Sequence, residues 1–199
     1  MALAKLGEGA NTGCMTQTDD SLRDHFLVAS PYLEDAGFHG AVVYLCEHSA
    51  EGAMGIVVNQ PLEITVGEVL DQLDIRRERP DQPVYAGGPV QTERGFVLHR
   101  TGGDWHGTIP VSDRISLTVS RDVLEAIGRG DGPRQYLMAL GYSGWGEGQL
   151  EEELASNSWL VTPADDDLLF RTPDESRYAG VLRAMGIDLN QLTNTVGHA

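Results

Sequence analysis

The sequence predicts an α+β domain. Strand-like segments outnumber helical ones, and the two kinds do not alternate as they do in a doubly wound parallel sheet. The 199 residues contain no internal repeat, low-complexity tract or linker rich in Pro, Gly and Ser. A chain of this length favours one domain. We therefore expect a single domain over residues 23–199, preceded by a flexible tail over residues 1–22, which are small, polar and aperiodic.

The first part of the domain predicts a strand and a hairpin. His25 to Val28 has the composition of a strand. Two longer strand-like segments, Gly40 to His48 and Met54 to Asn59, flank a turn at Ser49 to Gly52. Pro61 is expected to end the second strand of this hairpin, because proline cannot donate a hydrogen bond to a sheet.

A helix is predicted after this hairpin. Thr65 and Glu68 have the spacing of a capping box, in which a hydroxyl and a carboxylate each bond to a backbone amide of the first turn. The apolar residues that follow at i, i+3, i+4 and i+7 form one helix face: Val66, Val69, Leu70 and Leu73.

The sequence from residue 84 onward predicts further strands and three helices. The strands are expected at residues 84–86, 94–99, 109–111, 115–119, 135–140 and 159–161. The helices are expected at residues 121–127, capped by Ser120 and ended by Gly128; at residues 149–155; and after the capping-box sequence Thr172-Pro173-Asp174-Glu175, up to Gly186.

The charge balance restricts the function. Thirty acidic residues against 14 basic ones give a formal charge of −16, and duplex binding requires a clustered basic face. Direct binding of nucleic acid is therefore the least favoured function. The longest apolar run, Ala41 to Cys46, is far too short to span a bilayer, and the first 20 residues lack the apolar stretch of a secretion signal. We expect a cytoplasmic protein without a membrane-spanning segment.

Cys46 is the candidate reactive residue. Strand alternation would place Tyr44, Cys46 and His48 on one face, with thiol and imidazole as neighbours. A protonated imidazole near a thiol lowers the thiol's pKa, which would make Cys46 a nucleophile or redox sensor. The alternative is a small apolar cysteine in the core beside a hydrogen-bonded histidine.

No metal or cofactor site is predicted. Cys46-x-His48 offers two ligands where structural zinc needs four, and three adjacent carboxylates at Asp165 to Asp167 are typical of a solvated turn. The segment Gly141 to Gly148 follows a predicted strand, but its spacing does not match a nucleophile elbow, a dinucleotide fingerprint or a phosphate loop. Gly87-Gly88 is interpreted first as a turn and second as a pocket wall.

Several segments together resemble the AlgH/YqgE family of bacterial proteins. The matching pieces, within residues 24–188, are Phe26-Leu27-Val28-Ala29-Ser30-Pro31, Val42-Val43-Tyr44-Leu45-Cys46-Glu47-His48, Gly52-Ala53-Met54-Gly55-Ile56-Val57-Val58-Asn59, Gly87-Gly88-Pro89-Val90, Arg94-Gly95-Phe96-Val97-Leu98-His99, Leu140-Gly141-Tyr142-Ser143-Gly144-Trp145, Gly148-Gln149-Leu150-Glu151 and Trp159-Leu160. Two departures from the family pattern are Gln60, where lysine is usual, and Ser143, where alanine is common. The resemblance implies a bifurcated, largely antiparallel sheet that curls into a partial barrel with helices packed outside. It also implies the label of transcriptional regulator, without an assigned reaction.

Three functions follow from these observations. The first is a cytoplasmic regulatory or binding module that acts through a protein or small ligand, with a pocket near Cys46, His48, Asn59, Gly87 and Gly88. The second is a thiol-dependent enzyme or redox sensor that uses Cys46, with His48 as base or imidazolium partner. The third is direct DNA binding. The acidic helix at Glu151 to Glu153 is either a solvated face or a docking surface for a basic partner.

Overall fold

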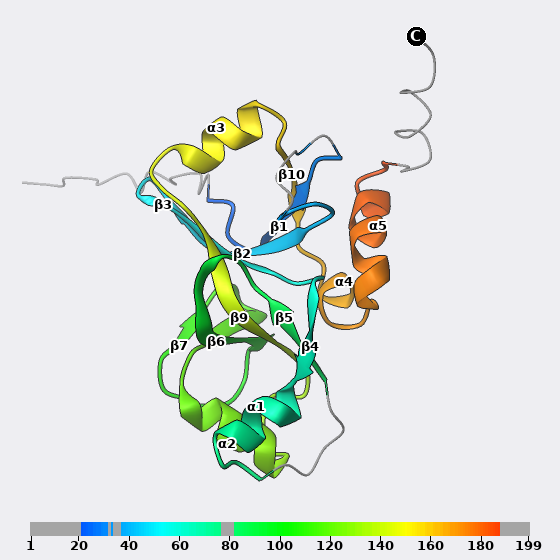
Figure 1. Ribbon diagram of the computed structural model, residues 1–199. Coiled ribbons are helices and arrows are strands. Elements are labelled where there is room, and N and C mark those ends of the chain that lie inside the picture. The colour runs from blue at the N-terminus through cyan, green and yellow to red at the C-terminus, as the bar shows by residue number, and fades with distance from the viewer. Residues whose placement is uncertain (1–20, 32, 34–36, 77–81, 188–199) are drawn as a thin grey trace, which may run out of the picture.

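A curled sheet with helices on its outside forms the body of the molecule (Figure 1). The computed structural model describes residues 21–31, 33, 37–76 and 82–187. The strands are β1 (His25–Ala29), β2 (Val42–Ser49), β3 (Gly52–Val57), β4 (Pro61–Thr65), β5 (Pro83–Ala86), β6 (Val90–Arg100), β7 (Thr108–Pro110), β8 (Ile115–Thr118), β9 (Tyr136–Trp145) and β10 (Trp159–Pro163). The helices are α1 (Val66–Gln72), α2 (Arg121–Arg129), α3 (Gln149–Ala155), α4 (Asp166–Phe170) and α5 (Asp174–Ala184).

The sheet divides at β9. The main path runs β10-β1-β2-β3-β9-β6-β8-β7, and β4 and β5 branch from it. The C-terminal half of β9 pairs with β3, for example Gly144 with Met54, whereas its N-terminal half pairs with the parallel strand β5, for example Met138 with Val84. Strand β6 runs antiparallel to β9 on the other edge. The predicted bifurcated, largely antiparallel sheet and the α+β class are therefore confirmed.

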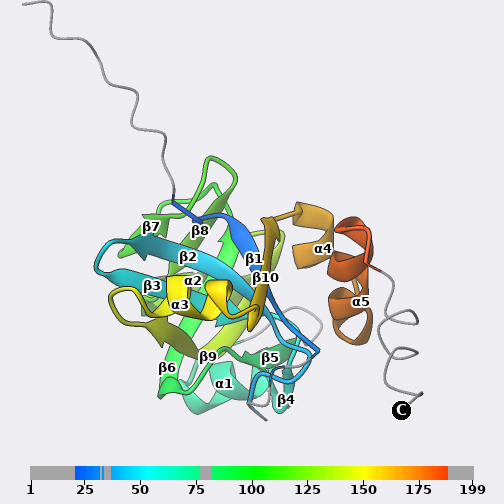
Figure 2. The ribbon, with the colours of Figure 1, turned by 90° about the horizontal axis from the view of Figure 1, so that it is seen from above.

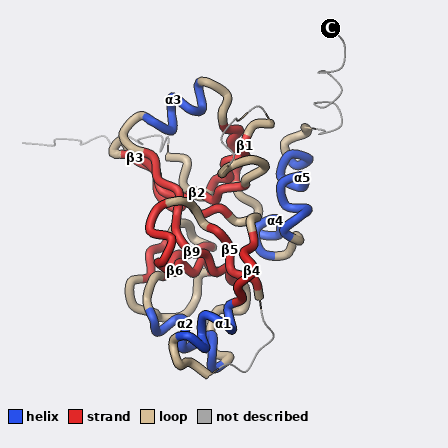
Figure 3. Tube along the Cα trace, viewed as in Figure 1, coloured by secondary structure: helices blue, strands red, loops and turns tan. Residues whose placement is uncertain are grey.

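Three groups of helices cover the sheet, and each covers its own apolar cluster (Figures 1 and 3). Helix α3 packs on β1 to β3 through the fully buried Leu150, which joins Trp145 and Trp159. Helices α1 and α2 cover a second cluster on β5, β6 and β9. The curled sheet forms a half-barrel. Helices α4 and α5 lie beside this half-barrel, as Figure 2 also shows, and their residues Leu169 and Leu182 join the apolar cluster in its interior.

Several local predictions are confirmed by the structure. Strands β2 and β3 form the expected hairpin, and α3 has the predicted bounds. The capping box is present in both directions: the Thr65 hydroxyl accepts from the Glu68 amide, and the Glu68 carboxylate accepts from the Thr65 amide at 2.8 Å. Gly186 follows α5 in the left-handed conformation.

Other local predictions were wrong, because sheet pairing overrides local signals. Pro61 was expected to end a strand, but it is the first residue of β4. Among the described strands β4 pairs only with β5, so the missing amide of proline at this first position removes little hydrogen bonding from the sheet. Strand β9 continues through Gly141 to Trp145, where a loop was expected. Helix α2 passes Gly128 and ends at Gly130. Pro173 is the N-cap of α5, without a side-chain cap bond.

Residues 1–20 of the predicted tail lie outside the described residues, but its last two members are held in place. The Ser21 hydroxyl donates to the backbone carbonyl of His48 over 3.1 Å, and the Leu22 amide donates to the His48 ring. No helix in the described part of the chain is long and apolar enough to cross a membrane.

Candidate functional site

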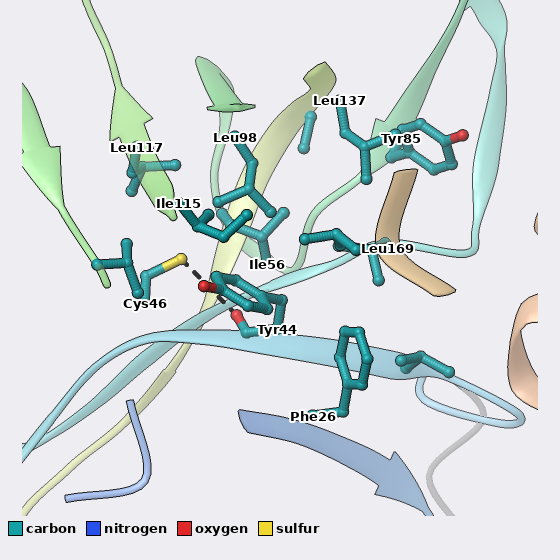
Figure 4. Close-up of a cluster of buried hydrophobic side chains, with 14 of the residues drawn as sticks. Phe26, Tyr44, Cys46, Ile56, Tyr85, Leu98, Ile115, Leu117, Leu137 and Leu169 are labelled. Atoms are coloured by element: carbon teal, nitrogen blue, oxygen red, sulfur yellow. Dashed lines mark hydrogen bonds between the residues drawn. The ribbon is translucent and has the colours of Figure 1, made fainter. Parts of the chain in front are cut away.

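Cys46 lies in the interior of the half-barrel. Its side chain is 4% exposed, and Sγ contacts the backbone carbonyl of Tyr44 at 3.7 Å, among the aromatic and aliphatic side chains of the interior cluster (Figure 4). Burial raises the pKa of the Cys46 thiol well above its ordinary value. The thiol is therefore neutral and packed, as in the alternative interpretation of the sequence, and it does not reach a ligand-accessible surface.

His48 does not lie beside Cys46, contrary to the expectation from strand alternation. The register between β2 and β3 shifts between Leu45 and Glu47, so that Glu47 pairs with Met54 and His48 with Ala53. This bulge adds one residue to β2 and moves His48 to the opposite face of the sheet from Cys46. The adjacency of thiol and imidazole, on which the nucleophile hypothesis depended, is absent.

The His48 ring joins the start of the described chain to α3. Its Nδ1 accepts a hydrogen bond from the Leu22 amide at 3.0 Å, and its Nε2 lies 2.9 Å from a carboxylate oxygen of Glu151. The acceptor role of Nδ1 requires the proton to sit on Nε2 in the neutral ring, where it is donated to Glu151. His48 therefore holds the segment at Leu22 and helix α3 in place relative to each other.

Asn59 ties the end of β3 to the start of β2. Its side-chain carbonyl accepts from the Val42 amide and its side-chain amide donates to the Gly40 carbonyl, both over 2.8 Å. Because both ends of the amide are occupied, Asn59 stabilises the loop before β2 instead of presenting a free group to a ligand.

Gly87 and Gly88 form a junction between strands. The Gly87 amide donates to Leu140 at 2.8 Å and its carbonyl accepts from Val57 at 2.9 Å. A Cβ at Gly88, whose φ is +150°, would lie 2.2 Å from the carbonyl carbon of Tyr142. Glycine is required here because backbone packs directly on backbone.

The structure instead shows a cleft at the open side of the half-barrel, between the tip of the β2–β3 hairpin and strands β6 to β9. Its volume is about 510 Å³. None of the five predicted pocket residues lines it. The apolar part of its lining comes from several strands and includes Met54, Phe96, Ile109, Leu117, Val119 and Tyr142. Phe96 and Tyr142 pack edge to face with ring centroids 5.7 Å apart.

Ile109 gives the cleft its exposed apolar surface. It is the central residue of the short edge strand β7, and 54% of its surface is exposed. Met54, on the opposite wall, is partly buried. A flexible thioether on one wall and an exposed branched side chain on the other provide an adaptable contact for an apolar group.

Three charged side chains line the cleft: Glu47, Glu51 and Arg94. The Arg94 guanidinium lies over the Phe96 ring, 5.6 Å from its centroid, and donates to the side chain of Gln91 at 3.2 Å. The carboxylates of Glu47 and Glu51 have no hydrogen bond or ion pair with any residue that the structure describes. The hairpin end of the cleft therefore carries two acidic groups without a partner among the described residues.

The acidic run at Asp165 to Asp167 is structural. Asp165 caps α4 through the amides of Asp167 and Leu168, and Asp166 pairs with Arg100 at 2.8 Å and with Arg114 at 3.1 Å. Within the described ranges, no group of three or more His, Cys, Asp or Glu side chains is arranged to hold a metal ion. Cys14 and His198 lie outside those ranges.

Comparison with known proteins places the chain in a family. The sequence profile described as AlgH-like matches residues 26–190. The chain belongs to the AlgH-like family. This AlgH-like chain is 49% identical to a UPF0301 protein of Hahella chejuensis over 93% of its own length and 100% of the relative's. It is 50% identical to a UPF0301 protein of Saccharophagus degradans, over 90% of this chain and 89% of the relative. The family resemblance expected from the sequence motifs is confirmed.

Solved structures show the same fold. The solution structure of the AlgH protein from Pseudomonas aeruginosa has a TM-score of 0.74 and 41% identity, covering 98% of this AlgH-like chain and 100% of that one. A crystal structure of a protein from Corynebacterium diphtheriae has a TM-score of 0.66 and 21% identity, covering 81% of this chain and 85% of that one. The second likeness concerns the fold alone.

Sequence reasoning missed the cleft because its lining comes from strands far apart in the chain. One local signal was present in β6, where Arg94 and Phe96 are two residues apart and therefore share a face. A second was Ile109, an apolar residue in a three-residue strand bounded by Pro110. Neither signal shows that the β2–β3 hairpin closes the other side of the cleft.

Proposed function

We propose that this AlgH-like protein is a binding module that acts through the cleft between the β2–β3 hairpin and strands β6 to β9. The observation that carries the proposal is the pairing of the exposed apolar side chain of Ile109 with two carboxylates, those of Glu47 and Glu51, that no described residue satisfies. A concave surface of about 510 Å³ that combines exposed apolar and polar groups is typical of an interaction surface or a binding groove.

The proposed role is regulatory and cytoplasmic, and it is exerted through a protein or small ligand instead of direct contact with DNA. A formal charge of −16 supports this route, because such a surface repels a phosphate backbone. Tight, salt-tolerant binding of a defined DNA duplex by the purified protein would contradict it.

Photocrosslinking tests the binding role. Benzoylphenylalanine replaces Ile109 in the cleft in one variant and Leu62 in the matched control; Leu62 is 37% exposed and lies on β4, away from the cleft. Irradiation of cells of the source organism should give covalent adducts at position 109 that are absent at position 62. The absence of adducts at position 109, or identical adducts at both positions, would overturn the proposal.

The alternative of a thiol-dependent enzyme or redox sensor requires a reactive Cys46. Burial of the thiol, its raised pKa and its separation from His48 weigh against this function. Alkylation by iodoacetamide at neutral pH in a Cys14→Ser variant is the test. We expect Cys46 to react more slowly than free cysteine, and a faster reaction would restore the alternative.

A further inference from the structure

The chemistry of the cleft indicates what it binds, provided that the proposed binding role holds. Its two carboxylates come from the same hairpin: Glu47 lies near the end of β2, and Glu51 lies in the turn before β3. On the facing wall, from β6 to β8, Ile109 supplies the exposed apolar surface, whereas Phe96 and Leu117 are almost fully buried. A matching ligand therefore carries positive charge toward the hairpin and apolar surface toward the facing wall.

Arg94 does not cancel this acidic character. Its guanidinium is held over Phe96 and bonded to Gln91, and no ion pair joins it to Glu47 or Glu51. Two carboxylates and one guanidinium give the lining a net charge of −1, in a chain with a formal charge of −16. A second copy of this chain or a nucleic acid would be repelled, whereas a basic partner would be attracted from a distance.

The exposure of the lining favours a polypeptide over a small cation. Small-molecule sites bury roughly 70–90% of the ligand surface, whereas Ile109 and both carboxylates are exposed to solvent. A peptide that continues beyond the cleft gains further contact, and the formal charge of −16 adds long-range attraction for a basic segment. We infer that the cleft binds a segment of a partner protein in which arginine or lysine side chains flank one or two large apolar side chains.

Fluorescence anisotropy with defined peptides tests this inference. The probe is a fluorescein-labelled, C-terminally amidated peptide of sequence Gly-Arg-Leu-Arg-Phe-Arg-Gly. One comparison peptide has glutamate in place of each arginine, and another has serine in place of leucine and phenylalanine. We expect the full-length protein to bind the probe at least about tenfold more tightly than either comparison peptide, because one lacks the charge complement and the other the apolar contact.

Variants assign the binding to the cleft. E47Q/E51Q should weaken probe binding about three- to tenfold and reduce its salt dependence, as expected for the loss of two exposed ion pairs. The matched control E63Q/E175Q changes the net charge equally on β4 and α5 and should change affinity by less than about twofold. Ile109→Ser should weaken binding, whereas Leu62→Ser should not; both sites are exposed, and circular dichroism verifies that each variant is folded.

The outcomes separate this inference from the binding role. Equal affinity for the arginine and glutamate peptides, equal effects of the two double variants, or displacement of the probe by millimolar guanidinium alone would overturn the inference. If crosslinking at position 109 then captured a segment without basic residues, the binding role would stand and the choice of partner would be wrong. If position 109 captured nothing, both would fail.

Discussion

Two arginines in this protein lie over aromatic rings, and their surroundings differ in almost every other respect. The Arg177 guanidinium lies 5.8 Å from the centroid of Tyr85, and that of Arg94 lies 5.6 Å from the centroid of Phe96. Arg177 is 2% exposed and joins α5 to the end of β3, whereas Arg94 is exposed at the cleft. The same kind of arginine–aromatic contact therefore stabilises the buried junction in one place and lies at the surface in the other.

The α5 junction is formed by Arg177, Asp174, Tyr85 and the carbonyl of Val58. Each of these groups is hydrogen-bonded to another member of the junction. Arg177 donates to Val58, Leu168 and Thr172 carbonyls and pairs with the Asp174 carboxylate at 3.1 Å. The Tyr85 hydroxyl donates to the same carboxylate at 2.6 Å, and burial raises the pKa of Tyr85 to about 12, which keeps that proton in place. At the cleft, by contrast, the carboxylates of Glu47 and Glu51 have no partner in the part of the chain that the structure describes. Fully hydrogen-bonded buried groups are typical of a structural junction, whereas the exposed carboxylates of the cleft are accessible to a partner.

The largest effect should separate the two arginines directly. Arg177→Ala removes a buried cation that bonds several groups and leaves the Asp174 carboxylate without its cationic partner, so it should lower the free energy of unfolding by about 3–5 kcal/mol. Arg94→Ala, the matched control, should cost about 1 kcal/mol or less, because its ring contact is exposed. Urea denaturation measures both. Equal losses would break the comparison.

A smaller loss is expected beside the α5 junction. Asn59→Ala removes the partners of the Val42 amide and the Gly40 carbonyl, and should cost about 1–3 kcal/mol. Asn59→Asp keeps the acceptor for Val42 but places a carboxylate against the Gly40 carbonyl, so it should not restore stability. Full restoration by aspartate would show that only the first bond contributes.

A pH effect should follow from His99 at the end of β6. The ring is buried, bonds to the Thr118 hydroxyl and the Arg100 carbonyl, and burial lowers its pKa below the ordinary 6.5. The unfolded chain binds this proton more readily than the folded protein does. The free energy of unfolding should therefore keep its full value above about pH 6.5 and decrease at lower pH, by at most about 1.4 kcal/mol per pH unit. His99→Gln should remove this slope in urea titrations between pH 5 and 7.5. An unchanged slope would assign it to other groups.

The smallest effect on stability should come from the cleft. Ile109→Ser changes a side chain that is half exposed, so the free energy of unfolding should change by about 0.5 kcal/mol or less. Thermal unfolding monitored by circular dichroism provides the measurement. A loss as large as that of Asn59→Ala would mean that Ile109 supports the fold, and would remove the contrast between the two regions.

Much of the local structure was predictable from the sequence. The capping box at Thr65 and Glu68 and the bounds of α3 depend on residues close in the chain, and the structure confirms both. The strand at β4 was not predictable, since Pro61 is tolerated there only because β4 pairs on one side with β5. The candidate site was missed for a similar reason: one additional residue at the β2 bulge moves His48 away from Cys46, and alternation contains no sign of it.

The sequence by itself determined the class of fold, the family and a formal charge of −16, because composition, periodicity and motif order are properties of the chain. Only the tertiary structure decided that Cys46 lies in the core and that Asn59 and Gly87-Gly88 stabilise connections between strands. It also decided that Glu47, Phe96 and Ile109 line one cleft. These outcomes depend on which strands pair and where a register shifts. Such long-range contacts are set by the packing of the whole sheet and not by neighbours in sequence.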